Sequence, residues 1–336
     1  MSAMTAHRLH FAFTIIYHYL FPQLTMGLAL LIVIFKVLAL RGNPYAVGAA
    51  RFWGRVFGLT FVMGVVTGIP IEFQIGAGWS RFAQATGGVI GQTLAMEGVF
   101  AFFLESSFLY LFLFGEKKMT PRQHLGAACL VMGGSWLSGW FIITTNAFMQ
   151  HPVGYVMREN GVIALDSLAT YLTNPWIIVQ YAHTMTGSVV TASFVVASIG
   201  AFYTLLDKHR DHARLFLRVG LVTGVVAAVM MAAPTGDLQM RLVVDHQPAS
   251  FAAMEGHFRT EDSAALTMIG QPDMDKLELD NPVSVPGMLS FMTYKRWNAR
   301  VEGLTSFDRD TWPDNVPLLY FAYHVMVGLG TIFMAI

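Results

Sequence analysis

Seven long apolar runs constrain the fold of this chain more than any other feature of its 336 residues. A helix needs about 20 mostly apolar residues to cross a bilayer, and each run is close to that length or longer. Only 12% of the residues are charged, about half the share of an average soluble domain. The sequence therefore predicts an all-α fold, a polytopic membrane helical bundle of about seven transmembrane helices. They are expected near residues 11–40, 56–78, 92–115, 125–148, 176–206, 215–235 and 318–336.

The runs divide the chain into three parts. Residues 1–235 are expected to form a six-helix transmembrane bundle, and residues 236–317 an extramembrane loop that holds most of the acidic residues. Residues 318–336 are expected to begin a seventh helix. Because the sequence stops inside that apolar run, we expect either that the chain is a truncated fragment or that the remaining helices lie on another segment.

Two counts limit the function classes. The formal net charge is zero, which gives no indication of nucleic-acid binding. Cys129 is the single cysteine, so the sequence excludes an internal disulfide and a cysteine-based metal cluster.

Lysine and arginine predict the orientation, because they gather on the cytoplasmic side of membrane proteins. With the N-terminus outside, eleven of these residues in the short connections face the cytoplasm and three face the exterior. The N-terminus and the long loop are therefore expected to be periplasmic. The cytoplasmic set is Lys36, Arg41, Arg51, Arg55, Lys117, Lys118, Arg122, Lys208, Arg210, Arg214 and Arg218, against Arg8, Arg81 and Arg158.

Ionisable side chains inside the predicted spans are functional candidates, because burying them in a bilayer is costly. They are His18, Glu72, Glu97, Glu105, His183 and His324. Single histidines on separate helices suit one axial haem ligand each, whereas zinc or copper would need several ligands close together. The alternative for each histidine is a structural hydrogen bond to a neighbouring helix, and for Met326 it is simple packing.

Glu97 and Glu105 lie in one run, "AMEGVFAFFLES". On an ideal helix they are separated by about 80° around the axis and about 12 Å along it. That spacing suits proton transfer between two depths. Ser106 and Ser107 are candidate hydrogen-bond links, and a polar track could extend over Ser135, Ser138 and Asn146 on the fourth span. The alternative is a structural ion pair for one of the glutamates.

Several motifs together resemble subunit I of the cytochrome bd quinol oxidases, across nearly the whole chain and in the same order. The compact loop resembles the short-loop, cyanide-insensitive branch of that family. The motifs are "IIYHYLFPQLTMG" (15–27), "RFWGRVFG" (51–58), "GIPIEFQIGAGWS" (68–80), "AMEGVFAFFLESSF" (95–108), "VQYAHTMTGS" (179–188) and "LYFAYHVMVGLG" (319–330).

The resemblance implies three haems. His18 matches the axial ligand of a high-spin haem, either b595 or d, and His183 and Met326 match the axial ligands of haem b558. Glu97 and Glu105 match an acidic pair beside the high-spin haems, implicated in haem ligation and proton delivery. The oxygen-binding haem is expected to be haem d or a second high-spin haem b.

The loop segment "HQPASFAAMEG" (246–256) resembles the quinol-binding loop of the family. Glu255 falls on the position of a quinol-site glutamate. Ser250 stands where the family usually has a lysine, and His324 where better-known members have an arginine.

The resemblance implies a terminal quinol:oxygen oxidoreductase in a bacterial inner membrane, with ubiquinol or menaquinol and O2 as substrates. It also implies a cytochrome bd subunit II and small single-helix accessory subunits as partners. Two other classes of protein stay open from the residues: a proton-coupled transporter, and a related haem protein that takes electrons from a donor other than quinol.

Overall fold

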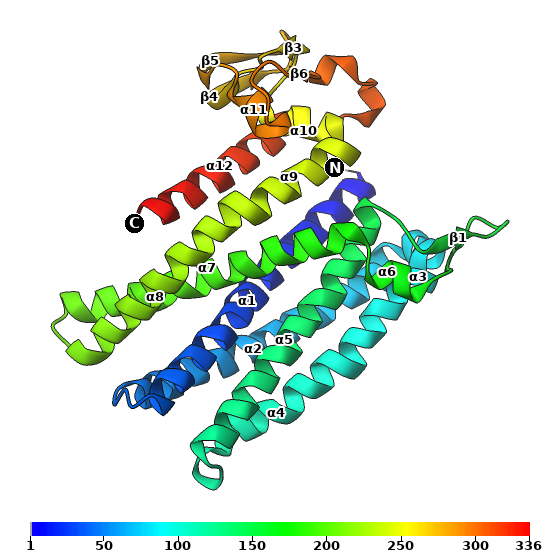
Figure 1. Cartoon of the computed structure of the whole chain (residues 1–336). Coiled ribbons are helices and arrows are strands. Elements are labelled where there is room, and N and C mark those ends of the chain that lie inside the picture. Colours follow the sequence, from blue (N-terminus) through cyan, green and yellow to red (C-terminus); the bar gives the residue numbers. More distant parts are fainter. Residues whose placement is uncertain (1) are drawn as a thin grey trace. The chain divides into compact units, whose positions relative to one another are not determined.

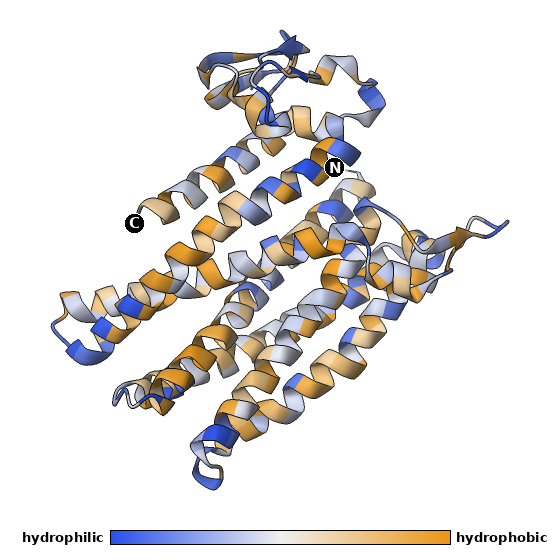
Figure 2. Cartoon of the chain, in the orientation of Figure 1, coloured by the Kyte–Doolittle hydropathy of each residue, from blue (hydrophilic) through white to orange (hydrophobic). Residues whose placement is uncertain are grey.

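The computed structural model describes residues 2–336, and within them seven helices are long and apolar enough to cross a membrane. The predicted fold class and number of spans are confirmed. Hydrophobic residues run along these helices, and hydrophilic residues gather at their ends and in the connections (Figure 2). The spans are Ala3–Leu40, Ala46–Gly78, Ser80–Phe114, Pro121–Gln150, Leu168–Leu205, Arg210–His246 and Val316–Ala335.

The described residues divide into two compact units, one up to Ala227 and one from Ala228 to Ile336. In the first unit α1 packs against α2, α5 and α7, and α4 packs against α5 (Figure 1). A short antiparallel hairpin, β1–β2, lies between α5 and α6. The elements are α1 (Ala3–Leu40), α2 (Ala46–Gly78), α3 (Ser80–Met96), α4 (Phe103–Phe114), α5 (Pro121–Gln150), β1 (Tyr155–Met157), β2 (Ile163–Leu165), α6 (Leu168–Leu172), α7 (Pro175–Leu205) and α8 (Arg210–Met230), which crosses into the second unit.

Local sequence fixes where the long helices begin. Thr120 accepts a hydrogen bond from the backbone N–H of Gln123, whose side chain bonds back to Thr120, and Pro121 occupies the first turn of α5. Asn174 caps α7 in a similar way, ahead of Pro175. Proline suits the first turn because its missing N–H would have no partner inside the helix.

The second unit joins short helices and hairpins to the last span. Strands β4 and β5 pair antiparallel, as do β3 and β6, and α10 packs against α12 around a small core that includes Phe258 and Leu304. The elements are α9 (Asp237–His246), α10 (Pro248–Glu255), β3 (Glu261–Asp262), β4 (Leu266–Asp273), β5 (Glu278–Val285), α11 (Met288–Tyr294), β6 (Arg300–Val301) and α12 (Val316–Ala335).

Several boundaries differ from those expected from hydropathy: the first, second and fifth spans begin eight to ten residues earlier, at Ala3, Ala46 and Leu168, and two other boundaries differ by more than ten residues. The sixth helix does not end near residue 235, because a π-helical turn at Met231–Gly236 accommodates Pro234 and the helix continues as α9 to His246. The third span begins at Ser80 rather than near residue 92. In both places polar residues and glycines lower the hydropathy, but the backbone still satisfies its own hydrogen bonds by staying helical.

Candidate functional site

Two carboxylates, one buried and one half-buried, face the same helix in the first unit. Ser138 Oγ donates a hydrogen bond to Glu97 Oε1 at 2.6 Å, and Ser135 Oγ donates to Glu105 Oε1. The serines are three residues apart on α5 and therefore share one face of it. Glu105 is only 6% exposed and Glu97 is half-buried. Both glutamates thus meet serines of the fourth span, whereas Ser106 donates its hydroxyl proton to the Phe103 carbonyl oxygen on its own helix.

The helix that carries these glutamates is irregular between them. A π-helical turn occupies Glu97–Phe102, between α3 and α4, so the spacing of an ideal α-helix does not apply there. Single π turns inside α-helices are frequent at functional sites, because the wider turn redirects side chains. Here Glu97 is the first residue of that turn and its carboxylate meets α5.

His18 is held in one tautomer by a threonine on α2. The Thr67 hydroxyl donates to the carbonyl oxygen of Met63 at 2.7 Å, so its oxygen is left to accept from His18 Nδ1 at 3.0 Å. A proton on Nδ1 leaves the lone pair of Nε2 unprotonated. This arrangement fits metal ligation, because ligating histidines usually donate their other ring N–H to an acceptor.

The other candidate ligands lie in different units. His183 is half-buried on α7 in the first unit, and Met326 is 48% exposed on α12 in the second. Glu72 has an exposed side chain on α2 and makes none of the contacts to α5 serines described above.

The second unit buries an acid at the end of α10. Glu255 is 4% exposed, and Tyr323 on α12 donates a hydrogen bond to Glu255 Oε1 at 2.8 Å. Glu255 Oε2 has no hydrogen-bond partner among residues 2–336. Burial raises the pKa of Glu255 above its ordinary value, and the Tyr323 hydrogen bond and the charge of His324 oppose that rise.

His324 connects α12 to the β4–β5 hairpin. Its Nδ1 lies 2.9 Å from the carbonyl oxygen of Tyr320, and its Nε2 lies 2.9 Å from the carbonyl oxygen of Thr267 on β4. Ser250 lies on α10 with Glu255, but five helical residues place the two about 140° apart around the axis. The structure therefore brings Tyr323, and not Ser250, to the carboxylate of Glu255.

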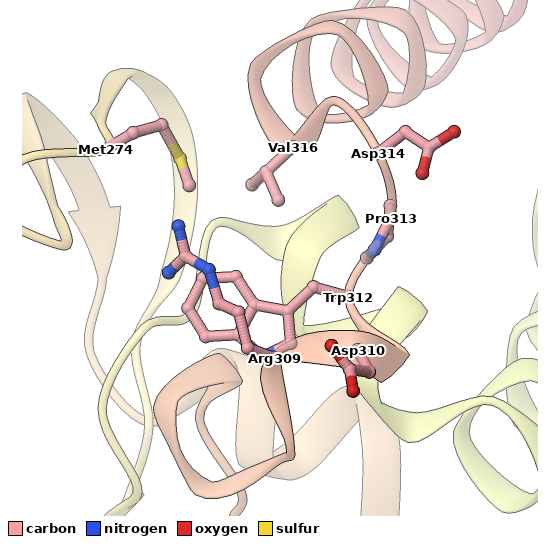
Figure 3. Close-up of a pocket in the computed structure, with 7 residues that line it drawn as sticks. All are labelled: Met274, Arg309, Asp310, Trp312, Pro313, Asp314 and Val316. Atoms are coloured by element: carbon pink, nitrogen blue, oxygen red, sulfur yellow. The ribbon is translucent and has the colours of Figure 1, made fainter.

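A pocket of about 400 Å³ opens elsewhere on the loop (Figure 3). The Arg309 guanidinium lies over the Trp312 ring, 4.1 Å from its centroid, and covers that face of the indole. Glu255 and Tyr323 are not among the lining residues, so this pocket is separate from the buried acid. The lining residues are Met274, Arg309, Asp310, Trp312, Pro313, Asp314 and Val316.

Comparison with known proteins decides the family. The family model described as "Cytochrome bd terminal oxidase subunit I" matches residues 6–336. The chain belongs to this family. It is 30% identical to the cytochrome bd ubiquinol oxidase subunit 1 of Bacillus subtilis (strain 168), over 99% of this chain and 73% of that protein. It is 34% identical to the cytochrome bd-II ubiquinol oxidase subunit 1 of Escherichia coli (strain K12), over 91% of this chain and 60% of that protein.

A solved structure agrees with this assignment. The bd oxidase from Geobacillus thermodenitrificans matches with a TM-score of 0.92 and 31% sequence identity, over 99% of this chain and 76% of that chain. As a cytochrome bd subunit I, the chain is a multi-pass membrane subunit of a quinol oxidase, an electron-transporting oxidoreductase. Family membership implies haem as prosthetic group and a subunit II as partner, and it favours the oxidase over a transporter.

The residues of this cytochrome bd subunit fit haem better than a clustered metal site. Within residues 2–336 no group of three or more His, Cys, Asp or Glu side chains could hold a metal ion together. His18 instead presents a single unprotonated nitrogen, oriented by Thr67. One imidazole on one helix is what an axial haem site requires of the protein.

Sequence reasoning missed two residues of these sites, Thr67 and Tyr323. Thr67 contacts a histidine 49 residues away, and Tyr323 contacts a glutamate 68 residues away. Neither spacing follows a helical or strand period, so periodicity gives no signal for either contact. Tyr323 directly precedes His324 in "YFAYHVM", and that adjacency is the one local indication of its place.

Proposed function

We propose that this chain is the haem-containing subunit of a terminal quinol:oxygen oxidoreductase. It oxidises quinol at the periplasmic side and supplies cytoplasmic protons for the reduction of O2 to water, so that turnover generates a proton-motive force. The observation that carries the proposal is the pair of membrane-embedded carboxylates, Glu97 and Glu105, each hydrogen-bonded by a serine from one face of α5.

Three residues of this chain would hold the haems. His18, with Nδ1 bonded to Thr67, would ligate a high-spin haem through Nε2, either b595 or d. His183 and Met326 would ligate haem b558, and a thioether ligand favours ferrous iron and raises the potential. When bound, haem b558, haem b595 and haem d (or a second high-spin haem b) carry electrons from quinol to O2.

Glu105 and Glu97 would carry protons inward from the cytoplasmic side. A carboxyl group can accept and release a proton, and a serine hydroxyl can donate and accept a hydrogen bond at once. Ser135 and Ser138 therefore stabilise the charged form of each glutamate but still allow it to be protonated. An ion pair with a lysine or arginine would instead hold the glutamate permanently in its charged form. This supports a proton-transfer role over a structural one.

Glu255 would accept a hydroxyl proton from the quinol. A general base must titrate near the working pH, and burial moves the pKa of Glu255 upward in that direction. The quinol would be ubiquinol or menaquinol. Ser250, on another face of α10, would contribute to the walls of the loop rather than to the proton transfer.

The distribution of lysine and arginine supports a periplasmic N-terminus and a periplasmic quinol loop in a bacterial inner membrane. A chemical test uses a Cys129→Ala background with a single new cysteine at Asp275, in the β4–β5 turn, or at Lys118, in the α4–α5 turn. A membrane-impermeant maleimide should label the first in cells with a permeable outer membrane and the second only after lysis. The reverse pattern would refute the orientation. Subunit II and small accessory subunits would complete the complex.

The catalytic proposal is tested by quinol-driven oxygen consumption of the purified complex. Replacing Glu105 or Glu255 by glutamine should lower the rate by about 100-fold or more, because a general acid or base contributes on that order. Glu302→Gln is the matched control, since Glu302 is an exposed acid of the same loop. Haem content, read from the visible spectrum, should be equal in all variants. An unchanged rate in Glu105→Gln would contradict the proton-delivery role.

A further inference from the structure

The carboxylate of Glu255 has two unequal oxygens. Tyr323 Oη lies 2.8 Å from Oε1, and because an ionised carboxylate only accepts hydrogen bonds, the phenol donates this one. Oε2 is buried and has no partner among residues 2–336. Since Glu255 is 4% exposed, bulk water does not equalise the two oxygens. The free lone pairs of the group are therefore concentrated on Oε2.

Tyr323 is fixed in place by its neighbours on α12. The next residue, His324, has both ring nitrogens 2.9 Å from carbonyl oxygens, one of them on β4. The Tyr320 ring lies against the His324 ring, with centroids 3.9 Å apart, and is 1% exposed. The phenol of Tyr323 thus projects from a stretch of helix that is tied to the hairpin and cannot easily swing away from Glu255.

We propose that Tyr323 is the positioning residue for Glu255, holding Oε1 so that Oε2 is the oxygen that receives the hydroxyl proton of the quinol. This inference rests on the proposed function. In the step, the quinol O–H bond breaks and its electron pair stays on the quinol oxygen. An O–H bond forms at Oε2, and Glu255 changes from an anion to a neutral acid.

The hydrogen bond also sets the pH at which Glu255 can act. The titratable groups that face Glu255 are Tyr320, Tyr323 and His324, all on α12. Tyr323 stabilises the ionised form, so its loss should favour the protonated form. A hydrogen bond to a charged group corresponds to a shift of about one to two pH units in such a titration.

The test compares Tyr323→Phe with Tyr320→Phe in the purified complex of both subunits. The Tyr320 hydroxyl is buried on the same helix but has no hydrogen-bond partner among residues 2–336, which makes Tyr320→Phe a matched control. The readout is the infrared band of the protonated carboxyl group as a function of pH, assigned to Glu255 by its loss in Glu255→Gln. A second readout is the pH profile of kcat/KM for quinol.

Tyr323→Phe should move the midpoint of the Glu255 band upward by about one to two pH units, and the acidic limb of kcat/KM should move with it. Tyr320→Phe should titrate as the wild type. An unshifted midpoint in Tyr323→Phe, or an equal shift in both variants, would overturn the inference. Wild-type quinol oxidation by Glu255→Gln is a separate result, because it would overturn the role proposed for Glu255 itself.

Discussion

Replacing Thr67 by valine should weaken the binding of the haem that His18 is proposed to ligate. Valine has the shape of threonine but lacks the oxygen that accepts from His18 Nδ1 at 3.0 Å. The Thr67 hydroxyl already donates its proton to Met63 O at 2.7 Å. Its oxygen can therefore only accept a hydrogen bond from His18. In the variant Nδ1–H would face a methyl group, and only the backbone hydrogen bond of His18 with Gly64 would remain to orient the ring.

The size of the effect follows from what is lost. A neutral hydrogen bond contributes about 0.5–1.5 kcal/mol net, and loss of an orienting partner of a ligating histidine costs roughly 10–100-fold in metal affinity. His18 is half-buried, so water can replace part of the lost bond. We therefore expect the lower end, about tenfold weaker haem binding, which corresponds to about 1.4 kcal/mol.

The assay is the rate of haem transfer from the oxidised complex to an excess of a haem-scavenging apoprotein, followed in the visible spectrum. The matched control is Thr60→Val, because Thr60 lies on α2 and bonds back to Val56 O at 3.1 Å in the same manner. Thr67→Val should lose one haem about tenfold faster than wild type and Thr60→Val should not. If His18→Ala loses that haem while Thr67→Val retains it normally, the orienting role is refuted.

Two further predictions concern stability. Glu116→Gln should lower the free energy of unfolding by about 1–3 kcal/mol, since Glu116 bonds the buried Lys36 at 3.0 Å and the exposed Arg51 at 2.6 Å, and partial exposure reduces the cost of breaking a buried pair. Burial alone would raise the pKa of Glu116, but the hydrogen bonds from Arg51 and Lys36 lower it below its ordinary value. Ionised Glu116 therefore contributes its full stabilisation of the folded protein at any pH above the ordinary pKa of glutamate. This stabilisation is lost as the pH falls through the lowered value, and the gap in unfolding temperature between wild type and variant should close there. Gly256→Ala should destabilise the second unit by about 2–4 kcal/mol, because φ is +63° and the added Cβ would lie 2.8 Å from the buried Tyr320 ring; an unchanged unfolding temperature would contradict this.

The spans were predictable because the bilayer imposes one rule on every stretch that crosses it. A run of apolar residues must satisfy its backbone internally, and so seven runs became seven helices among residues 2–336. Their ends were less predictable, because helices continue past the apolar stretch wherever no residue stops them. The sixth helix passes Pro234 through a π turn and adds α9, whose polar residues had suggested a loop.

The candidate site was predictable only where an ionisable residue lies in an otherwise apolar run. Glu97, Glu105 and His18 stand out in apolar runs, and their cost marks them without any knowledge of the fold. Thr67 and Tyr323 do not stand out in the sequence, because threonine and tyrosine are ordinary in membrane helices. Their roles arise from tertiary contacts with a histidine and a glutamate on other elements, which hydropathy does not encode.

The last helix carries residues for both proposed events of quinol oxidation, proton acceptance by Glu255 and electron transfer to the haem that Met326 would ligate. Tyr323, which holds the proposed proton acceptor, and Met326, the proposed iron ligand, are three residues apart on α12, about 4.5 Å along its axis. The bond between His324 and Thr267 O ties this stretch to the hairpin of the loop. Oxidation of a quinol to a quinone removes two protons and two electrons from one small molecule, so the groups that receive the protons and the electrons must keep a fixed separation. A single rigid helix turn provides that separation more reliably than two flexible loops, because its backbone hydrogen bonds resist independent movement of the two side chains.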